Sequence, residues 1–300
     1  MAPKVQQPER QKITIPKLYE MKANKEPVSW LTCYDYPTAL LMDRAGVDMI
    51  LVGDSLGMTM LGYPTTLPVT MDVMITFTAA VCRAVKYAFV IGDMPYMSYQ
   101  VSKEEAIRNA GRFMSECGTD AVKLEGGVRM APIVRVITDA GIPVMGHIGL
   151  TPQSASQLGG YKAQGRDAET AKRLIADAEA LEEAGAFAIL LECVPAPVAK
   201  IIHERVKIPV YGLGSGTDVD GQLMIVHDMI GMFERFTPKF VKQYVNLSPI
   251  LLEAFSKYRE DVKSKKFPQP EHFYSIAEGE LEKLLKVLKS SGRVLKHPAQ

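Results

Sequence analysis

The chain is poor in cysteine, and the cysteines that it has form no motif. Its 300 residues include four, Cys33, Cys82, Cys117 and Cys193, which lie far apart and in no spacing typical of a metal site or a redox pair. All four lie within apolar segments, where free cysteines usually behave as small core residues. We therefore expect reduced thiols, as is typical of a cytoplasmic protein.

The sequence also lacks an excess of charge and a long apolar run. Its 35 Lys and Arg against 34 Asp and Glu give a net charge of +1, which provides no electrostatic basis for binding nucleic acid or an anionic membrane. No apolar run approaches the roughly 20 residues that span a bilayer. Residues 1–11 are polar, unlike a signal peptide. We expect a cytoplasmic protein that has small-molecule substrates and no nucleic-acid or membrane partner.

The most informative feature that is present is a set of five short apolar runs, each followed by an ionisable side chain. The runs end directly before Asp54, Asp93, Lys123, His147 and Glu192. Runs of this kind predict strands that are buried on both faces, as in a parallel sheet. Open sheets and barrels of parallel strands carry their chemistry at the carboxyl ends of the strands, so these five side chains predict one active site.

Strand and helix patterns alternate along the rest of the chain. A first strand is predicted at residues 28–33, a seventh at 208–212 and a weak eighth near 240–244, after a helix at about 218–230. Eight strand-then-helix units in a chain with 47% apolar residues predict a closed (β/α)8 TIM barrel. A doubly wound open sheet is the alternative.

Two segments lie outside the predicted barrel domain of residues 26–275. Residues 1–25 form an N-terminal segment with a short helix, and residues 276–300 form a C-terminal helical extension. The extension has an apolar stripe at helical spacing, formed by Leu281, Leu284, Leu285 and Leu288. An isolated helix of that length is marginally stable in water, so we expect this extra helix to dock on the barrel or on a neighbouring subunit.

Asp54 and Asp93 predict a metal site. Each follows a glycine at the end of a predicted strand. Their carboxylate oxygens suit Mg2+ or another divalent cation, which takes one or two carboxylates and completes its coordination with waters and substrate oxygens. Glu125, a further carboxylate at a strand end, strengthens this interpretation. The alternative is that both aspartates cap helices in the loops that follow the strands.

Lys123 and Glu125 lie two residues apart on one predicted strand, so their side chains point the same way. Neither the packed interior of a barrel nor its helical ring tolerates a charge without a partner. One interpretation is therefore a structural ion pair. The sharper hypothesis is that Lys123 binds a substrate carboxylate, near a metal that has Glu125 in its outer coordination shell.

His147 and Glu192 are candidate catalytic residues. His147 lies at a strand end before a glycine, and this position favours an active-site role over that of a satisfied core histidine. Glu192 follows five apolar residues, and a carboxylate in such a setting is a candidate general base. The alternative for Glu192 is a salt bridge to a basic residue of a loop.

Two motifs suggest other activities. Gly53-Asp54-Ser55-Leu56-Gly57 matches a hydrolase nucleophile elbow, but Gly57 and the residues after it prevent the long helix that an elbow needs. The turn at 212–217 resembles a dinucleotide-binding turn, but Thr217 stands where the pattern G-x-G-x-x-G needs glycine. We interpret this turn as an anion- or substrate-contacting loop.

Several longer segments resemble the ketopantoate hydroxymethyltransferase (3-methyl-2-oxobutanoate hydroxymethyltransferase) family. The resemblance covers about residues 25–275, and the matching segments follow one another at residues 52–58, 67–70, 93–97, 122–127, 146–153, 159–165 and 191–195. It implies a (β/α)8 barrel of the phosphoenolpyruvate/pyruvate type. It also implies a homo-oligomer, often a decamer.

The reaction that the resemblance implies transfers a hydroxymethyl group from 5,10-methylenetetrahydrofolate to 3-methyl-2-oxobutanoate and gives ketopantoate, as the first step of pantothenate biosynthesis. By position, Asp54 and Asp93 match the family's Mg2+ ligands, with Glu125 in the metal site. The matching keto-acid contacts are Asp54, Ser55, Asp93 and Lys123, and Glu192 matches the catalytic base.

Two features depart from the resemblance. The family tends to have a Gly-rich segment where this chain has two phenylalanines, within residues 231–236, and residues 277–300 extend beyond the usual end. Two rival classes are also open. A Mg2+-dependent keto-acid lyase or decarboxylase on the same barrel would need no tetrahydrofolate, and a non-catalytic keto-acid or folate binder would need no base such as Glu192.

Overall fold

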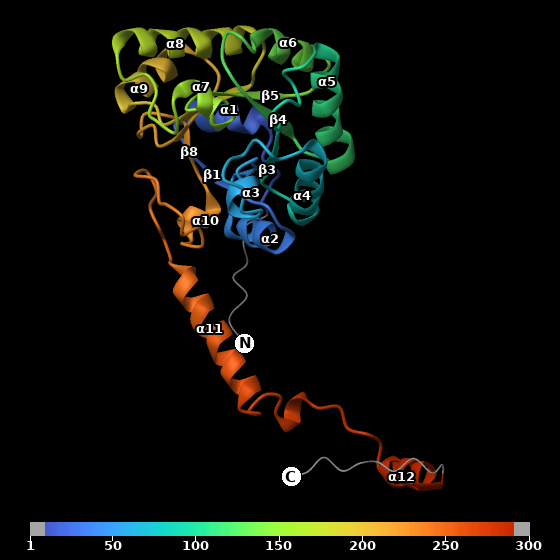
Figure 1. Ribbon diagram of the computed structural model, residues 1–300. Coiled ribbons are helices and arrows are strands. Elements are labelled where there is room, and N and C mark those ends of the chain that lie inside the picture. The colour runs from blue at the N-terminus through green and yellow to red at the C-terminus, as the bar shows by residue number, and fades with distance from the viewer. Residues whose placement is uncertain (1–9, 291–300) are drawn as a thin grey trace. The chain divides into compact units, whose positions relative to one another are not determined.

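The computed structural model describes residues 10–290, and its centre is a closed barrel of eight parallel strands (Figure 1). The strands follow one another around the barrel in sequence order: β1 (Val28–Thr32), β2 (Met49–Val52), β3 (Phe89–Asp93), β4 (Ala121–Glu125), β5 (Val144–Gly149), β6 (Ala188–Glu192), β7 (Val210–Leu213) and β8 (Gly221–Met224). Parallel pairing of β1 with β8, which sets Val28 opposite Gly221, closes the barrel. The predicted TIM barrel is confirmed, and the open sheet is excluded.

Helices surround the strands and short helical turns follow several of their carboxyl ends. The outer helices are α2 (Tyr36–Ala45), α4 (Met71–Ala84), α5 (Lys103–Arg112) with the π-helical turn η1 (Phe113–Cys117), α6 (Ala131–Asp139), α8 (Ala168–Glu183) and α9 (Ala196–Arg205). The short turns are α3 (Leu56–Thr59), η2 (Pro152–Ser154), α7 (Ala155–Leu158) and α10 (Val226–Met229). Capping residues define the starts of the long helices, because the side chains of Asp35, Thr70, Ser102 and Asp167 accept hydrogen bonds from the first turn.

The strands are buried on both sides, as their apolar runs predict, and they separate two cores. On β2, Ile50 and Val52 pack into the cluster between the strands and the helices. Met49 and Leu51 point the other way, into the cluster that fills the barrel. Within that interior cluster, the rings of Trp30 and Tyr211 meet edge to face at 5.7 Å. The packed interior leaves the carboxyl ends of the strands as the place where a ligand can enter.

The short N-terminal helix α1 (Ile15–Ala23) packs against the interior cluster at one end of the barrel and is not part of the outer ring. Its buried Leu18 and Met21 join the cluster inside the barrel. Lys22 forms an ion pair of 2.8 Å with Asp220, directly before β8. Asp220 and the start of β8 lie at the amino-terminal side of the strands, so α1 closes the end of the barrel that is opposite the predicted site.

The last part of the barrel differs from the sequence prediction. The eighth strand is Gly221–Met224, inside the segment predicted as a helix, and no strand forms at 240–244. No helix lies between β7 and β8 in the described chain, so the expected strand-then-helix order fails there. The four-residue strand is too short to show a clear alternation in the sequence. It forms because pairing with β1 on one side and β7 on the other satisfies its backbone.

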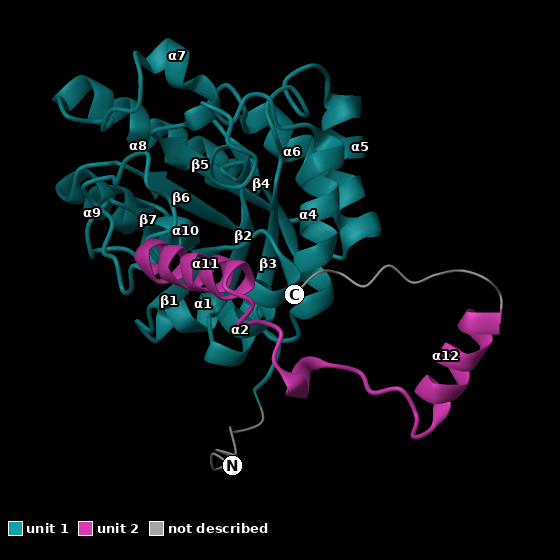
Figure 2. Ribbon diagram, turned by 60° about the horizontal axis from the view of Figure 1, so that its bottom comes forward, with its two compact units in different colours: residues 1–246 teal, residues 247–300 magenta. Residues whose placement is uncertain are grey.

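The chain divides into two compact units, residues 1–246 and residues 247–300 (Figure 2). The sequence predicts a barrel domain that ends at residue 275. The second unit contains α11 (Leu247–Lys263), the turn η3 (Pro270–His272) and α12 (Glu280–Ser290), and none of its described residues is buried. The predicted stripe of α12 is exposed, with 51% of Leu281 and 46% of Leu284 accessible to solvent. Among residues 10–290, no helix combines the length and apolar character needed to cross a membrane.

Candidate active site

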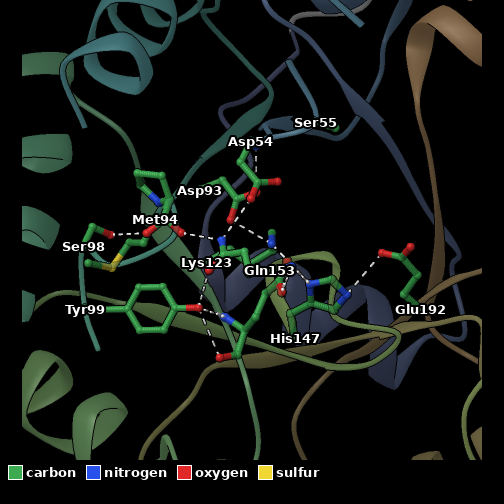
Figure 3. Close-up of polar contacts among 12 residues, drawn as sticks. Asp54, Ser55, Asp93, Met94, Ser98, Tyr99, Lys123, His147, Gln153 and Glu192 are labelled. Atoms are coloured by element: carbon green, nitrogen blue, oxygen red, sulfur yellow. Dashed lines mark hydrogen bonds and ion pairs between the residues drawn. The ribbon is translucent and has the colours of Figure 1, made fainter. Parts of the chain in front are cut away.

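All seven residues that the sequence analysis singled out line one cavity at the carboxyl ends of the strands. The cavity has a volume of about 420 Å3, and the seven are Asp54, Ser55, Asp93, Lys123, Glu125, His147 and Glu192. Strand register accounts for their proximity, because Asp93 on β3 pairs with Lys123 on β4, and Glu125 on β4 pairs with His147 on β5. The structure thus gathers side chains that are far apart in the sequence (Figure 3).

Lys123 and Asp93 form the central contact of the cavity. Lys123 Nζ lies 2.7 Å from Asp93 Oδ1, and both side chains are buried. The backbone N–H of Asp54 donates to the other oxygen of Asp93 at 3.0 Å. Gly53 permits this turn, since a Cβ there would lie 2.8 Å from Ser55 Oγ. Asp54 and Asp93 therefore make their contacts within the site and do not cap the helices that follow their strands.

Three carboxylates share the positive charge of Lys123. Burial raises the pKa of Asp54, of Asp93 and of Glu125, the last to about 7, although Lys123 opposes the shift in each case. Burial by itself would lower the pKa of Lys123, but the nearby carboxylates outweigh it and raise that pKa. The Lys123 ammonium group is therefore charged, and three buried carboxyl groups have this one lysine between them.

His147 connects this cluster to Glu192. Its Nδ1 lies 3.2 Å from Lys123 Nζ, and its Nε2 lies 3.3 Å from Glu192 Oε2. A lysine ammonium group has only donors, so Nδ1 accepts, and a neutral ring carries its proton on Nε2. That nitrogen is buried and forms no hydrogen bond within residues 10–290, although Glu192 Oε2 lies close to it. Burial and the charge of Lys123 lower the pKa of His147, which keeps the ring neutral. Glu192 retains slight exposure, 13% of its side chain.

Two residues that the sequence analysis gave no role hold the carboxylates in place. The Gln153 side-chain amide donates to Asp54 Oδ2 and to the carbonyl of Met94, both at 3.0 Å. Its backbone N–H donates to Glu125 Oε2 at 3.0 Å. The hydroxyl of Tyr99 donates to Gln153 Oε1 at 2.8 Å, as Figure 3 shows. The only sequence signal for Gln153 was its position shortly after a strand end, within a segment that resembles the family.

The Gly-rich turn after β7 has a different place from the one expected. Leu213 lines the cavity, whereas Gly214, Gly216 and Thr217 line a neighbouring cavity of about 940 Å3, which shares Cys193 and Phe240 among its lining residues with the first. Ser215 is buried and donates to the carbonyl of Leu191 at 2.8 Å. The turn therefore packs β7 against β6, and the expectation that it contacts a ligand of the main site is unsupported by these contacts.

Comparisons with solved structures show which known proteins share this fold. Phosphonopyruvate hydrolase in complex with oxalate and Mg2+ superposes with a TM-score of 0.59 at 12% identity, covering 93% of this chain and 99% of the other. A 2,3-dimethylmalate lyase, a member of the PEP mutase/isocitrate lyase superfamily, superposes with a TM-score of 0.53 at 15% identity, covering 93% and 99%. These similarities show the barrel fold of that superfamily.

Sequence comparisons then identify the family. The model of ketopantoate hydroxymethyltransferase matches residues 12–270. The 3-methyl-2-oxobutanoate hydroxymethyltransferase of Moorella thermoacetica is 54% identical over 89% of this chain and 99% of its own length. That of Syntrophomonas wolfei is 52% identical over 91% and 99%. The chain belongs to the ketopantoate hydroxymethyltransferase family.

The shared charge of Lys123 predicts a pH-dependent loss of stability in Lys123→Met. Removing the cation leaves buried carboxylates without compensation, so the free energy of unfolding of metal-free protein at pH 8 should fall by about 3–5 kcal/mol. Carboxyl groups with raised pKa values bind more protons in the folded than in the unfolded state. The loss should therefore shrink as the pH falls through the pKa of Glu125, about 7, toward 5.

Urea denaturation at both pH values measures this difference. Lys103→Met, at an exposed position of α5, is the matched control and should change stability by less than about 0.5 kcal/mol. A loss in Lys123→Met that is the same at pH 8 and pH 5 would show that Lys123 acts by packing alone.

Proposed function

We propose that this chain transfers a hydroxymethyl group from 5,10-methylenetetrahydrofolate to 3-methyl-2-oxobutanoate, giving ketopantoate (2-dehydropantoate) in the first step of pantothenate biosynthesis. Relatives above 50% identity carry the name of this activity over nearly their whole length. The observation in the structure that carries the proposal is the Lys123–His147–Glu192 connection beside buried carboxylates. Such a site can bind an anionic keto acid and remove a proton from it.

A keto-acid lyase or decarboxylase on the same barrel is the weaker alternative. The solved structures with hydrolase and lyase names are only 11–15% identical to this chain and support the fold alone. A non-catalytic binder is also disfavoured, because it would have no use for a carboxylate placed 3.3 Å from a buried histidine at the cavity. The family match and the position of Glu192 together favour the transferase.

The keto acid is bound, in this proposal, by Asp54, Ser55, Asp93 and Lys123. Lys123 supplies the positive charge for the substrate carboxylate, and its ion pair with Asp93 fixes the ammonium group before the substrate arrives. Ser55 Oγ lies 2.8 Å from the hydroxyl of Tyr34, which orients the serine toward the cavity. The site is therefore organised in advance for a small anion.

Asp54 and Asp93 are our proposed ligands for a divalent cation, Mg2+ or a similar ion, with Glu125 close to it. The three buried carboxylates are all oxygen donors, and Glu125 Oε1 accepts no hydrogen bond from the described residues. Residues 10–290 contain no group of three or more His, Cys, Asp or Glu arranged to enclose a metal. Mg2+ takes one or two carboxylates and leaves positions for water and substrate. When bound, the cation supplies Lewis-acid stabilisation of negative charge on the keto acid.

Glu192 is the proposed general base and His147 its positioning partner. In this role the N–H at His147 Nε2, which lies 3.3 Å from Glu192 Oε2, would form a hydrogen bond that holds the glutamate carboxylate at the cavity. Glu192 accepts the proton from C3 of the keto acid, and the electron pair left on C3 forms the new bond to the methylene carbon of the donor. Both bonds from that carbon to the folate nitrogens break in the overall reaction, and water supplies the hydroxyl group. The remaining proton of the water and the proton taken from C3 end on the two nitrogens, and tetrahydrofolate is released. His147 stays neutral because burial and Lys123 both lower its pKa.

A homo-oligomer, up to a decamer, is the proposed assembly. The second compact unit exposes large apolar side chains along α11, including 68% of Leu252, 66% of Phe255 and 60% of Tyr258. Exposed apolar surface of this extent usually marks an interaction site.

We also propose that the protein has an N-terminal segment at residues 1–25, a catalytic domain at 26–275 and a C-terminal extension at 276–300. Its proposed location is the cytoplasm.

Removal of divalent cations should abolish turnover. Exhaustive chelation should stop ketopantoate formation and added Mg2+ should restore it. Asp54→Asn and Asp93→Asn should each lower kcat/KM at least about 100-fold and weaken Mg2+ binding in calorimetry, since each loses a charged ligand. Asp218→Asn, on the exposed turn after β7, is the matched control. Full activity after chelation would refute the metal site.

Glu192→Gln should separate proton removal from substrate binding. The wild-type protein should catalyse Mg2+-dependent deuterium uptake at C3 of 3-methyl-2-oxobutanoate in heavy water without folate. Glu192→Gln keeps the shape but cannot accept a proton, so exchange should fall at least about 100-fold while keto-acid binding persists. Glu204→Gln, exposed on α9, should behave as wild type. Exchange that survives in Glu192→Gln would assign the base to another residue, with His147 next.

Truncation after Ser275 should affect assembly rather than chemistry. Loss of α12 should reduce the oligomer size in light scattering, or lower the melting temperature by at least about 2 °C, with turnover per chain unchanged. The full-length variant Leu281→Glu/Leu285→Glu should reproduce this effect, whereas Glu282→Ala/Lys286→Ala, with both changes outside the apolar stripe, should not. A truncated protein with unaltered size and melting temperature would show that the stripe has no role.

A further inference from the structure

A buried carboxylate that the proposed chemistry does not use lines the active-site cavity. Asp228, on the short helix α10, is only 6% exposed. Within residues 10–290 its side chain accepts no hydrogen bond and forms no ion pair, and burial raises its pKa to about 6. Above that pH it is an anion without a donor. Such a group is costly in a folded protein unless a ligand supplies the donors.

Asp228 lies close to the proposed keto-acid contacts. Helix α10 is attached to the end of β1, because the backbone N–H of Val226 donates to Thr32 Oγ1 at 3.0 Å. The ring of Tyr34 stacks on that of His227, with centroids 5.4 Å apart, and its hydroxyl contacts Ser55. Burial raises the pKa of Tyr34, and the charge of Asp228 adds to this effect. Asp228 therefore lies near Tyr34, and the Tyr34 side chain links the neighbourhood of Asp228 to Ser55.

The walls beside Asp228 suit a flat ring rather than a second small anion. Phe233, Phe236 and Phe240 line the same cavity, and the rings of Phe233 and Phe236 meet at 5.8 Å. The keto acid is itself an anion, which a buried carboxylate repels. An aromatic wall with one carboxylate instead fits a planar heterocycle that presents N–H groups along one edge.

We propose that Asp228 binds the 2-amino-4-oxopyrimidine edge of the folate donor. That edge presents two adjacent N–H donors, one on the ring nitrogen and one on the 2-amino group, which match the two oxygens of a carboxylate. The inference rests on the proposed function, since it assigns the donor site of that reaction. The proposal also places the phenylalanines of residues 231–236 against the folate ring. These are the residues at which this chain departs from its family.

Binding of tetrahydrofolate alone provides the direct test. Calorimetry on the full-length protein should show that Asp228→Asn raises the dissociation constant for tetrahydrofolate by about 30- to 100-fold. This is the effect of losing hydrogen bonds to a charged acceptor. Asp218→Asn should bind as wild type does. An analogue with a methyl group in place of the 2-amino group should bind wild type weakly. Asp228→Asn should weaken the binding of this analogue much less than it weakens the binding of tetrahydrofolate. The comparison of the two ligands on wild type tests the donor pair even if Asp228→Asn folds poorly.

Kinetics separate this site from the keto-acid site. Asp228→Asn should raise KM for 5,10-methylenetetrahydrofolate at least about 30-fold. KM for the keto acid and the folate-independent deuterium exchange should stay within about twofold of wild type. Wild type that binds tetrahydrofolate, with Asp228→Asn and the 2-methyl analogue binding equally well, would overturn the inference and leave the proposed function intact. Collapse of deuterium exchange in Asp228→Asn would place Asp228 in the keto-acid site and also overturn it. Wild type that neither binds tetrahydrofolate nor forms ketopantoate would overturn both.

Discussion

The ion pair between Lys123 and Asp93 is the contact on which the rest of the site depends. The pairing of β3 with β4 sets these residues opposite each other, and their 2.7 Å contact fixes the ammonium group among three buried carboxylates. The same ammonium group lies 3.2 Å from His147 Nδ1 and therefore decides which nitrogen of that ring carries the proton. Through this choice, a charge on β4 places the N–H of His147 on the nitrogen that lies 3.3 Å from the carboxylate of Glu192 on β6. A shift of register by one residue would turn Lys123 into the helical layer and remove the whole arrangement.

The carboxylates keep their positions because backbone and amide groups hold them before any ligand binds. Gln153 donates to Asp54 through its side chain and to Glu125 through its backbone, and Tyr99 in turn holds Gln153. These neutral donors add hydrogen bonds without adding charge. Three carboxyl groups therefore surround one lysine, and a divalent cation would supply the further positive charge that stabilises their deprotonated forms. Rigidity of this kind limits the reorganisation needed when charge develops on a substrate.

The cavity combines two environments with opposite preferences. Its charged floor, at the ends of β2 to β6, suits a small anion that chelates a cation, whereas the phenylalanines of residues 233–240 suit a flat apolar ring. In the proposed reaction these are the two substrates, and Asp228 would prevent the keto acid from occupying the aromatic side by charge repulsion. Because different physical interactions bind the two substrates, each substrate has its own place within the cavity of about 420 Å3.

The local sequence determined the strands and their chemistry, because a run of apolar residues that ends at a charged one is visible without knowledge of its partners. Seven residues read in this way, or from the family resemblance, line one cavity. The tertiary structure alone decided the rest. β8 is four residues long and forms through its neighbours, so the helix expected at 218–230 and the strand expected at 240–244 were both wrong. Gln153 reaches Asp54 across 99 positions, and Val226 reaches Thr32 across 194. Polar contacts of this range depend on how the closed barrel brings distant strand ends together, and no local pattern encodes that distance.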